Sequence, residues 1–294
     1  MTPAYRGAAA LAQRLPGGLI DAVVPPLTAL AAMPSRGRRA MVERHQRRVD
    51  PSLSGEALAR RVRDVYRSYG HYYAESFRLP AIGPAELAAR MTYEGFEHVD
   101  AARDGGHGPL MLMPHLGSWE WPAYWLTRVR GIPVTAVVER IEPPALFDWF
   151  VEFRRSIGMQ IVPIGPEAGR TIMSAIRDRH VIPLLCDRDI NRSGVEVTFF
   201  GEKTTLPSGP AVLALRTGTP LLPTATYDRG RDHHGVVRPP LPVAREGTLR
   251  QDVARITQLM ADALEELIRE APQQWHLMQP NWPSDETARG PVRL

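Results

Sequence analysis

The sequence is nearly free of cysteine: Cys186 is the only one among its 294 residues. A disulfide within the chain is therefore excluded, and a reducing compartment is the simplest interpretation. Because Cys186 directly follows the apolar run 181–185, we expect a buried structural thiol rather than a nucleophile.

A long apolar segment is also missing. The best candidate, residues 19–33, is shorter than the roughly 20 residues that a membrane-spanning helix needs, and it contains Asp21 and the pair Pro25-Pro26. It lacks the basic start and the cleavage site of a signal peptide. Two compatible arrangements stay open: the segment lies in the plane of a membrane, or it forms an ordinary helical hairpin packed on the core.

Several catalytic motifs are absent as well. No Gly-x-Ser-x-Gly motif occurs, which disfavours an esterase of the α/β-hydrolase type. No Gly-x-x-x-x-Gly-Lys or Gly-x-Gly-x-x-Gly loop occurs, which disfavours nucleotide hydrolysis and dinucleotide binding. His233 and His234 are not a metal motif without further ligands, so we expect no metal site.

What the chain does have is an excess of positive charge, with a formal net charge of +4 and a pI of about 9.5. Such a charge favours anionic lipid head groups, nucleic acid or a polyanionic molecule such as coenzyme A as partner. No nucleic-acid partner is expected, because the arginines lack interleaved aromatic residues and no recognition fold is visible. The arginines gather near the N-terminus: Arg36, Arg38, Arg39, Arg44, Arg47, Arg48, Arg60, Arg61 and Arg63.

From about residue 90, short apolar runs alternate with helical stretches. This alternation predicts an α/β fold with a central mixed, mostly parallel sheet flanked by helices. Residues 1–80 carry helical patterns instead, including a longer helix that starts at Ser54. We therefore expect an N-terminal helical cap and membrane-contact region over residues 1–80 and an α/β core over residues 81–294, in one integrated domain. The apolar runs are residues 110–113, 134–138, 160–163, 181–185, 195–200 and 221–226.

His115 is the first candidate for catalysis. It follows the strand-like run 110–113 almost directly, and active sites in open α/β sheets lie at the carboxyl ends of strands. Gly117 and Ser118 permit a sharp turn, after which Glu120 stands at the start of a helix, where its carboxylate can meet the imidazole. Such a pair predicts a general base that activates a hydroxyl. On this spacing alone, a helix-capping or core histidine is the commoner explanation.

Three sequence blocks favour a catalytic His115 over a structural one, because together they resemble one superfamily. The order strand, His-x-x-x-x-Glu, helix over residues 110–120 is similar to the motif of the glycerolipid acyltransferases. Residues 187–201 (DRDINRSGVEVTFFG) resemble the second block of the lipid A late acyltransferase family, and residues 272–276 (PQQWH) resemble its Pro-x-x-Trp close. Residues 72–80 and 275–282 resemble the actinobacterial branch, which contains phosphatidylinositol mannoside acyltransferases.

The resemblance covers about residues 55 to 284 and implies a glycerolipid-acyltransferase-like fold and an activity. The activity is transfer of a fatty acyl group, typically palmitoyl, from acyl-CoA to a mannose hydroxyl of a phosphatidylinositol mannoside. Acyl-CoA is then a co-substrate, and no bound cofactor is expected. His115 becomes the general base and Glu120 the acidic position of the motif, where many members have Asp. Such enzymes are peripheral on the cytoplasmic face of the plasma membrane, so a glycolipid acceptor and an anionic membrane surface are the expected partners.

Glu196 is the third residue expected to be catalytic. Strand alternation puts Val195, Val197 and Phe199 on one face and Glu196 on the other. Since the lipid A acyltransferases often carry an apolar residue there, we interpret Glu196 as a polar contact to His115 or to the acceptor sugar. A solvated strand residue is the alternative.

The expected substrate-binding residues lie in three segments, and the arginines among them can bind phosphate groups. Most arginines are simply surface charges, which is the alternative for each one. Asp189 also competes with Glu196 for the contact to His115. The substrate-binding candidates are Glu139, Arg140, Arg154, Arg188, Asp189 and His276. Core packing accounts for the aromatic residues after His115, which can also wall an acyl-chain tunnel: Trp119, Trp121, Tyr124 and Trp125.

Other functions stay open beside the acyltransferase. An acyl-CoA thioesterase would use the same His115 to activate water, and an acyltransferase could act on a different glycolipid. A third class is a non-enzymatic protein that binds anionic lipid or nucleic acid through the basic N-terminal region.

Overall fold

The computed structural model describes residues 36–140, 142–190 and 192–287, so the apolar segment 19–33 lies outside the described residues. The helices are α3 (Arg36–Val49), α4 (Gly55–Arg78), η1 (Leu79–Ala81), α5 (Pro84–Ala89), α6 (Glu97–Asp104), α7 (Glu120–Arg128), α8 (Pro144–Ser156), α9 (Ala168–Arg177), α10 (Gly209–Thr217), α11 (Leu249–Glu270), η2 (Pro272–Gln274) and α12 (Pro283–Thr287). The strands are β1 (Met91–Glu94), β2 (Leu110–Met113), β3 (Thr135–Val138), β4 (Gln160–Pro163), β5 (Ile182–Leu185), β6 (Val195–Phe199), β7 (Glu202–Leu206), β8 (Leu221–Arg229) and β9 (Asp232–Val237).

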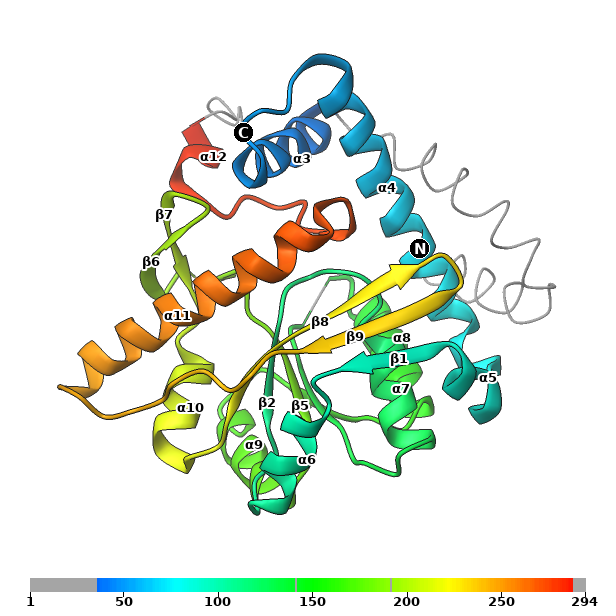
Figure 1. Cartoon of the computed structure of the whole chain (residues 1–294), viewed down its shortest axis with the longest axis vertical. Coiled ribbons are helices and arrows are strands. Elements are labelled where there is room, and N and C mark those ends of the chain that lie inside the picture. Colours follow the sequence, from blue (N-terminus) through cyan, green and yellow to red (C-terminus); the bar gives the residue numbers. More distant parts are fainter. Residues whose placement is uncertain (1–35, 141, 191, 288–294) are drawn as a thin grey trace.

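The central sheet has the strand order β1-β9-β8-β2-β5. A parallel bridge between Val134 and Val181 continues it toward the parallel pair β3-β4. Strand β2 lies parallel to both β5 and β8, and β1 lies parallel to β9, whereas β8 and β9 are antiparallel. The predicted α/β fold with a mixed, mostly parallel sheet flanked by helices is confirmed (Figure 1).

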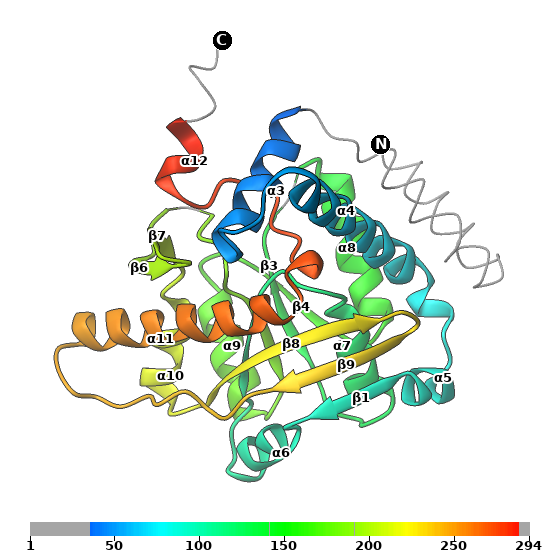
Figure 2. The same ribbon diagram turned by 45° about the horizontal axis from the view of Figure 1, so that its top comes forward.

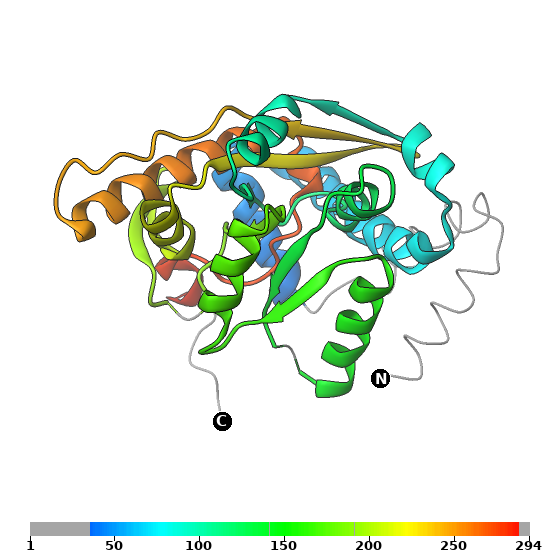
Figure 3. The same ribbon diagram turned by 90° about the horizontal axis from the view of Figure 1, so that it is seen from below.

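Helices cover both faces of this sheet because its strands are apolar on both sides. In β2, Leu110 and Leu112 pack with residues of α9, α10 and α11, whereas Met111 and Met113 pack with α7 and α8. In the view from below, the orange α11 and the green α8 lie on opposite sides of the strands (Figure 3). The carboxyl ends of β2 and β5 therefore emerge between two packed layers of helices.

The sequence pattern does not predict β1, β7 and β9, since none of them is an uninterrupted apolar run. Strand β9 begins with Asp232 and two histidines and pairs with both β1 and β8. Strand β7 folds back on β6 as an antiparallel hairpin. Its two-residue loop consists of Phe200 and Gly201, both with positive φ, as short hairpin loops require.

Helices α3 and α4 lie side by side at one end of the molecule (Figure 2). Arg48 at the end of α3 donates hydrogen bonds to Glu202 and to Asp285, each at 2.8 Å. Its guanidinium lies 4.1 Å from the centre of the Trp282 ring. This arginine, expected in the membrane-contact region, is therefore engaged within the protein. The division at residue 80 stays a prediction.

Two of the helices in the described ranges, α4 and α11, exceed 20 residues, with 24 and 22. Both carry charged residues along their length. Within the residues that the structure describes, no helix combines the length and the apolar character needed to cross a membrane.

Candidate active site

His115 and Asp187 follow two neighbouring strands at the same height. In the parallel pair β2-β5, Met113 lies opposite Leu185, and each of the two residues comes two positions after its strand ends. Nδ1 of His115 lies 2.5 Å from Oδ1 of Asp187, and the backbone N–H of His115 donates to Oδ2 at 3.0 Å. The strand register therefore builds a carboxylate–imidazole pair.

The C-terminal segment 272–282 holds the backbone of His115 in place. Leu116 and Trp275 form an antiparallel bridge, and the N–H of His276 donates to the carbonyl oxygen of His115 at 2.7 Å. The loop after β2 is thus paired with a segment far along the chain, since His276 follows His115 by 161 positions.

Asp187 is completely buried, with 0% of its side chain exposed. The indole N–H of Trp275 donates to its Oδ2 at 2.7 Å, and the side-chain amide of Asn281 donates to its carbonyl oxygen at 2.9 Å. Burial alone would raise the pKa of Asp187, but the charge and hydrogen bonds of His115, together with Trp275, hold it below its usual value. Asp187 is therefore ionised at neutral pH and stabilises positive charge on the imidazole.

The turn between β2 and α7 depends on Gly117, as the sequence predicts. Its φ is +60°, and a Cβ atom there would lie 1.9 Å from the carbonyl oxygen of Thr226, so no other residue fits without a shift of the backbone. Its N–H donates to the carbonyl oxygen of Gln274 at 3.1 Å. The hydroxyl of Ser118 donates to Glu75 of α4 at 3.0 Å. The loop that carries His115 is therefore fixed by β8, α4 and the C-terminal segment.

A cavity of about 520 Å³ opens beside His115, which is a usual size for a small-molecule site. Most of its walls are apolar or aromatic, and they come from α4, α8, α10 and the ends of β3 and β5. The site residues expected from the sequence that line this cavity are His115, Glu139, Arg154, Arg188 and His276. Those that do not line it are Glu120, Arg140, Asp189 and Glu196.

Glu120 does not meet His115, so that part of the expectation is wrong. Only 1% of its side chain is exposed, and its Oε1 accepts hydrogen bonds from Tyr72 and Arg154, each at 3.0 Å. Helices α4 and α8 supply the donors that a buried carboxylate needs, and Asp187 already occupies the position beside the imidazole. Burial raises the pKa of Glu120, although Arg154 and Tyr72 oppose this shift. That Glu120 matters for catalysis stays a prediction. It would act by holding Tyr72 and Arg154, which both line the cavity.

Glu196 does not approach His115 either. Its side chain is 65% exposed, and Nζ of Lys203 on the neighbouring strand donates to it at 2.6 Å. The predicted alternation along β6 is confirmed, because Val197 and Phe199 are buried. That alternation turns Glu196 away from the core, so the expected polar contact with His115 is wrong.

Asp189 has a structural role in the loop between β5 and β6. Its Oδ2 accepts hydrogen bonds from the N–H of Gly194 and the hydroxyl of Thr205, each at 2.8 Å. Asp189 was a candidate for the contact with His115, but Asp187, two positions earlier, makes that contact.

His276 is the second histidine of the cavity, and its surroundings differ from those of His115. Its Nε2 lies 2.9 Å from the hydroxyl oxygen of Ser68, and its ring packs against Tyr69 and Tyr72. Burial lowers the pKa of His276 to about 4. It is therefore neutral at pH 7, and no carboxylate of the described residues forms an ion pair with it that would favour the cation.

Both arginines of the cavity are already paired with carboxylates. Arg154 binds Glu120 and lies 4.8 Å from the centre of the Trp119 ring. Arg188 donates to Glu139 at 3.0 Å, and its buried Nε has no hydrogen-bond partner within the described residues. Arg140 is exposed and lies outside the cavity, with its guanidinium 5.7 Å from the centre of the Phe147 ring.

The aromatic residues after His115 divide between cavity and core. Trp119 lines the cavity, whereas Trp121, Tyr124 and Trp125 are buried in the hydrophobic cluster on the α7 side of the sheet. Cys186 is 1% exposed, and burial raises its pKa, so the prediction of a buried thiol is confirmed.

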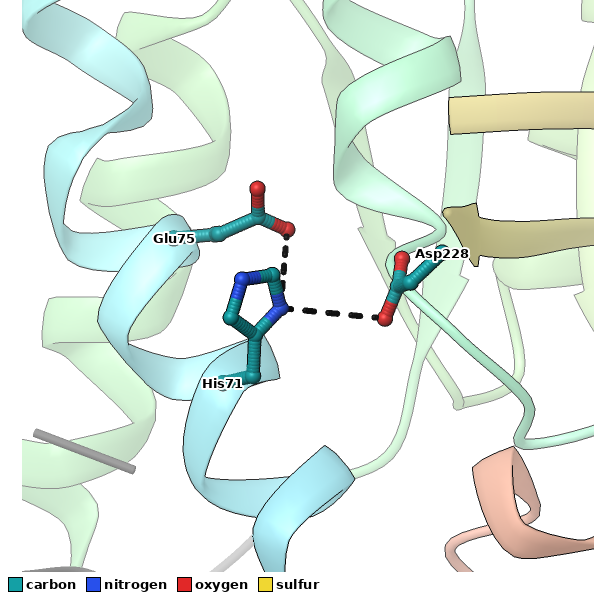
Figure 4. A group of neighbouring side chains, drawn as sticks. All are labelled: His71, Glu75 and Asp228. Carbon is teal, nitrogen blue, oxygen red and sulfur yellow. Dashed lines mark ion pairs between the residues drawn. The ribbon is translucent and has the colours of Figure 1, made fainter. Parts of the chain in front are cut away.

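A second group of charged side chains connects α4 with β8 and β9. His71 and Glu75 of α4 point toward Asp228 of β8 (Figure 4), with Nδ1 of His71 3.6 Å from Glu75 and 3.9 Å from Asp228. The fully buried His233 of β9 lies 3.2 Å from Glu75 and 3.2 Å from Asp228. Arg90 lies 3.3 Å from Glu75. We call these five residues the buried ion network.

Three members of this network have the side chains of a metal site. The ligand atoms of His71, Glu75 and Asp228 lie within 4.8 Å of one another. Arg90 and His233 lie beside the two carboxylates and supply cationic partners, whereas neither carboxylate oxygen of Asp228 has a hydrogen-bond partner of good geometry within the described residues. The expectation that the chain needs no metal stays a prediction.

Sequence reasoning missed Asp187 as the partner of His115, although a signal was present. Asp187 follows the apolar run 181–185 as closely as His115 follows the run 110–113, and adjacent parallel strands bring such positions together. For the buried ion network, His71 and Glu75 stand four residues apart on one helix face. Nothing in the sequence indicates that His233 meets them, because β9 itself was not predicted.

The chain is similar to known acyltransferases over most of its length. Residues 4–284 match the sequence model of a family described as bacterial lipid A biosynthesis acyltransferase. A phosphatidylinositol mannoside acyltransferase of Mycobacterium tuberculosis is 39% identical over 233 residues, which are 77% of this chain and 72% of that protein. The protein of the same name from Mycolicibacterium smegmatis is 36% identical over 236 residues, 79% of this chain and 76% of its own length.

The buried ion network predicts a stability that falls at alkaline pH. Burial lowers the pKa of His233, but hydrogen bonds and charge from Asp228 and Glu75 outweigh it and raise the pKa from 6.5 to about 9. The resulting stabilisation is complete below pH 6.5 and is lost as the pH rises through 9. Urea unfolding across this range should show a loss of about 3 kcal/mol that His233→Gln abolishes. His234→Gln on the same strand is the control, and an equal loss in both variants would contradict the assignment.

Proposed function

Because the chain belongs to the bacterial lipid A biosynthesis acyltransferase family, we propose that it transfers a palmitoyl group from acyl-CoA to a mannose hydroxyl of a phosphatidylinositol mannoside. The names of its mycobacterial relatives support a glycolipid acceptor of this kind. The observation that carries the chemistry is the contact of 2.5 Å between His115 and the buried Asp187 at the wall of a largely apolar cavity.

His115 acts as the general base. Its Nδ1 is engaged by Asp187, which leaves Nε2 to take the proton of the acceptor hydroxyl. The hydroxyl oxygen attacks the thioester carbonyl and forms a carbon–oxygen bond. The tetrahedral intermediate then collapses with cleavage of the carbon–sulfur bond, and the coenzyme A thiolate takes the proton back from His115. Asp187 lowers the free energy of the imidazolium that exists between these two proton transfers.

Electrostatics favours His115 over His276 for this role. Both line the cavity, but only His115 has an ionised carboxylate on one ring nitrogen. The pKa of His276 of about 4 makes it a weak base at neutral pH. His276 instead offers a neutral ring that can exchange hydrogen bonds with a sugar hydroxyl.

The two ends of the substrates differ in chemistry, and so do the walls of the cavity. Phe147, Phe150 and Leu213 are among the apolar side chains that suit an acyl chain. Arg154 and Arg188 are the cations that face the same space. Arg188 faces this space as the partner of Glu139, and its guanidinium can bind a phosphate of acyl-CoA or of the lipid.

We place the reaction at an anionic membrane surface, on the cytoplasmic face of the plasma membrane, with the protein bound peripherally. Both the net charge of +4 and the apolar rim of the cavity support this proposal. Ile164 and Ile190 line the cavity and are nevertheless 51% and 45% exposed. Large exposed apolar side chains at the mouth of a lipid site suit contact with a bilayer.

Release of coenzyme A from palmitoyl-CoA, with and without phosphatidylinositol mannoside, tests the reaction. We expect acceptor-dependent release that His115→Ala and Asp187→Asn each reduce by about a hundredfold to ten-thousandfold, because both remove the function of the base. Glu196→Gln should keep its activity within about twofold, since Glu196 is exposed.

Each other outcome of this assay rejects a part of the proposal. Equal release without acceptor would indicate a thioesterase, and release that depends on another glycolipid would change the acceptor. Full activity of Asp187→Asn would reject the proposed pair.

Substitution of Glu120 separates a positioning role from a direct one. Glu120→Gln weakens the hold on Arg154 and Tyr72, so KM for acyl-CoA should rise about tenfold while kcat falls less than in Asp187→Asn. Glu152→Gln, an exposed carboxylate on the same helix as Arg154, is the control. An unchanged KM with a loss of kcat as large as that of His115→Ala would show that Glu120 takes part in the chemical step.

The membrane proposal predicts a role for the rim of the cavity. The double variant Ile164→Ser, Ile190→Ser should bind vesicles of phosphatidylinositol and phosphatidylcholine several-fold more weakly in co-sedimentation, because two apolar side chains no longer enter the bilayer. Leu249→Ser, at a site 54% exposed and remote from the cavity lining, is the matched control. Equal binding by the wild type and the double variant would contradict this orientation.

A further inference from the structure

A second, smaller cavity lies against the active-site cavity. It measures about 30 Å³, which exceeds the roughly 10–15 Å³ that a single water needs. The two cavities share two lining residues, Trp119 and Pro183. These two side chains therefore form the wall between them.

The smaller cavity lies beneath α7. Its walls include Ala123 and Leu126 of that helix and Met111 and Met113 of β2, all members of one hydrophobic cluster. Thr224 also lines it, but its hydroxyl donates to the carbonyl oxygen of Leu222 at 2.9 Å. The space is thus almost entirely apolar, which suits hydrocarbon better than water.

Trp119 is the part of the wall that can be removed. Pro183 belongs to β5 and pairs with Met111 of the neighbouring strand β2, so its position is fixed by the fold. Trp119 precedes the first residue of α7, is 9% exposed, and presents its ring to the guanidinium of Arg154. Arg154 also packs on Phe150 and binds Glu120, so its position does not depend on the indole alone.

We propose that the indole of Trp119 closes the active-site cavity toward the space beneath α7 and thereby limits the length of the acyl chain that the enzyme accepts. This inference rests on the proposed function, because it takes the occupant of the apolar part of the cavity to be an acyl chain. A smaller side chain at this position joins the two cavities and admits further methylene groups into the hydrophobic cluster.

The test compares acyl-CoA substrates of increasing chain length with the wild type and Trp119→Leu. For the variant, the ratio of the transfer rate with a chain two carbons longer than palmitoyl to the rate with palmitoyl should rise about tenfold, since two more methylenes become buried. Trp119→Phe should shift the ratio in the same direction by less. This conservative variant also provides the answer if Trp119→Leu does not fold.

Two further variants make the test specific. Trp125→Leu removes a tryptophan of equal exposure, 9%, from α7, the helix that Trp119 directly precedes. Trp125 lines neither cavity, so the chain-length ratio should stay as in the wild type. Ala123→Leu fills the smaller cavity from its own wall. In the Trp119→Leu background it should return the ratio to the wild-type value.

Affinities for the same acyl-CoA series, measured by calorimetry, separate this inference from the proposed function. A longer optimum in Trp119→Leu without acceptor-dependent transfer by any variant would support the wall and reject the transferase. Transfer by the wild type with identical chain-length profiles in the wild type, Trp119→Leu and Trp119→Phe would reject the wall. An equal shift in Trp125→Leu would reject it too.

Discussion

The parallel pairing of β2 with β5 is the constraint on which the site depends. Met113 opposite Leu185 sets the height at which both chains leave the sheet, and two residues later the imidazole and the carboxylate meet at 2.5 Å. A slip by one residue would turn every side chain of β2 to the opposite face. In β2 the leucines and the methionines pack with different layers of helices, so the shape of the core, rather than its apolar character alone, opposes such a slip.

Buried carboxylates around the cavity differ in what they face, and this difference assigns their roles. Asp187 faces an imidazole that remains one-third exposed and lines the cavity. Glu120 faces a guanidinium and a phenol, and Glu75 faces Arg90, His233 and a serine hydroxyl. These latter carboxylates pair with groups inside the protein and connect α4 with α7, α8 and β9.

Features that depend on the local sequence pattern could be predicted from the sequence alone. The central strands, the turn at Gly117 and the position of His115 at the end of a strand all follow from apolar runs and from residue type. The partner of His115 could not be found by spacing along the chain, because it depends on which strands are neighbours. Strand β9 could not be predicted for the same reason. Asp232 and the two histidines are typical of a loop, but hydrogen bonds to β1 and β8 on both sides make this segment a strand.

The pairing of Trp275 with Leu116 has a consequence for the order of events during synthesis. The ribosome delivers His115 and Asp187 long before the segment 272–282 emerges, so a nascent chain contains both residues while the indole donor and the backbone bridge of Trp275 are still missing. The contacts that Trp275 makes with Leu116 and Asp187 can therefore form only after translation has passed residue 275. Chains cut short before that point would carry the residues of the site without its geometry.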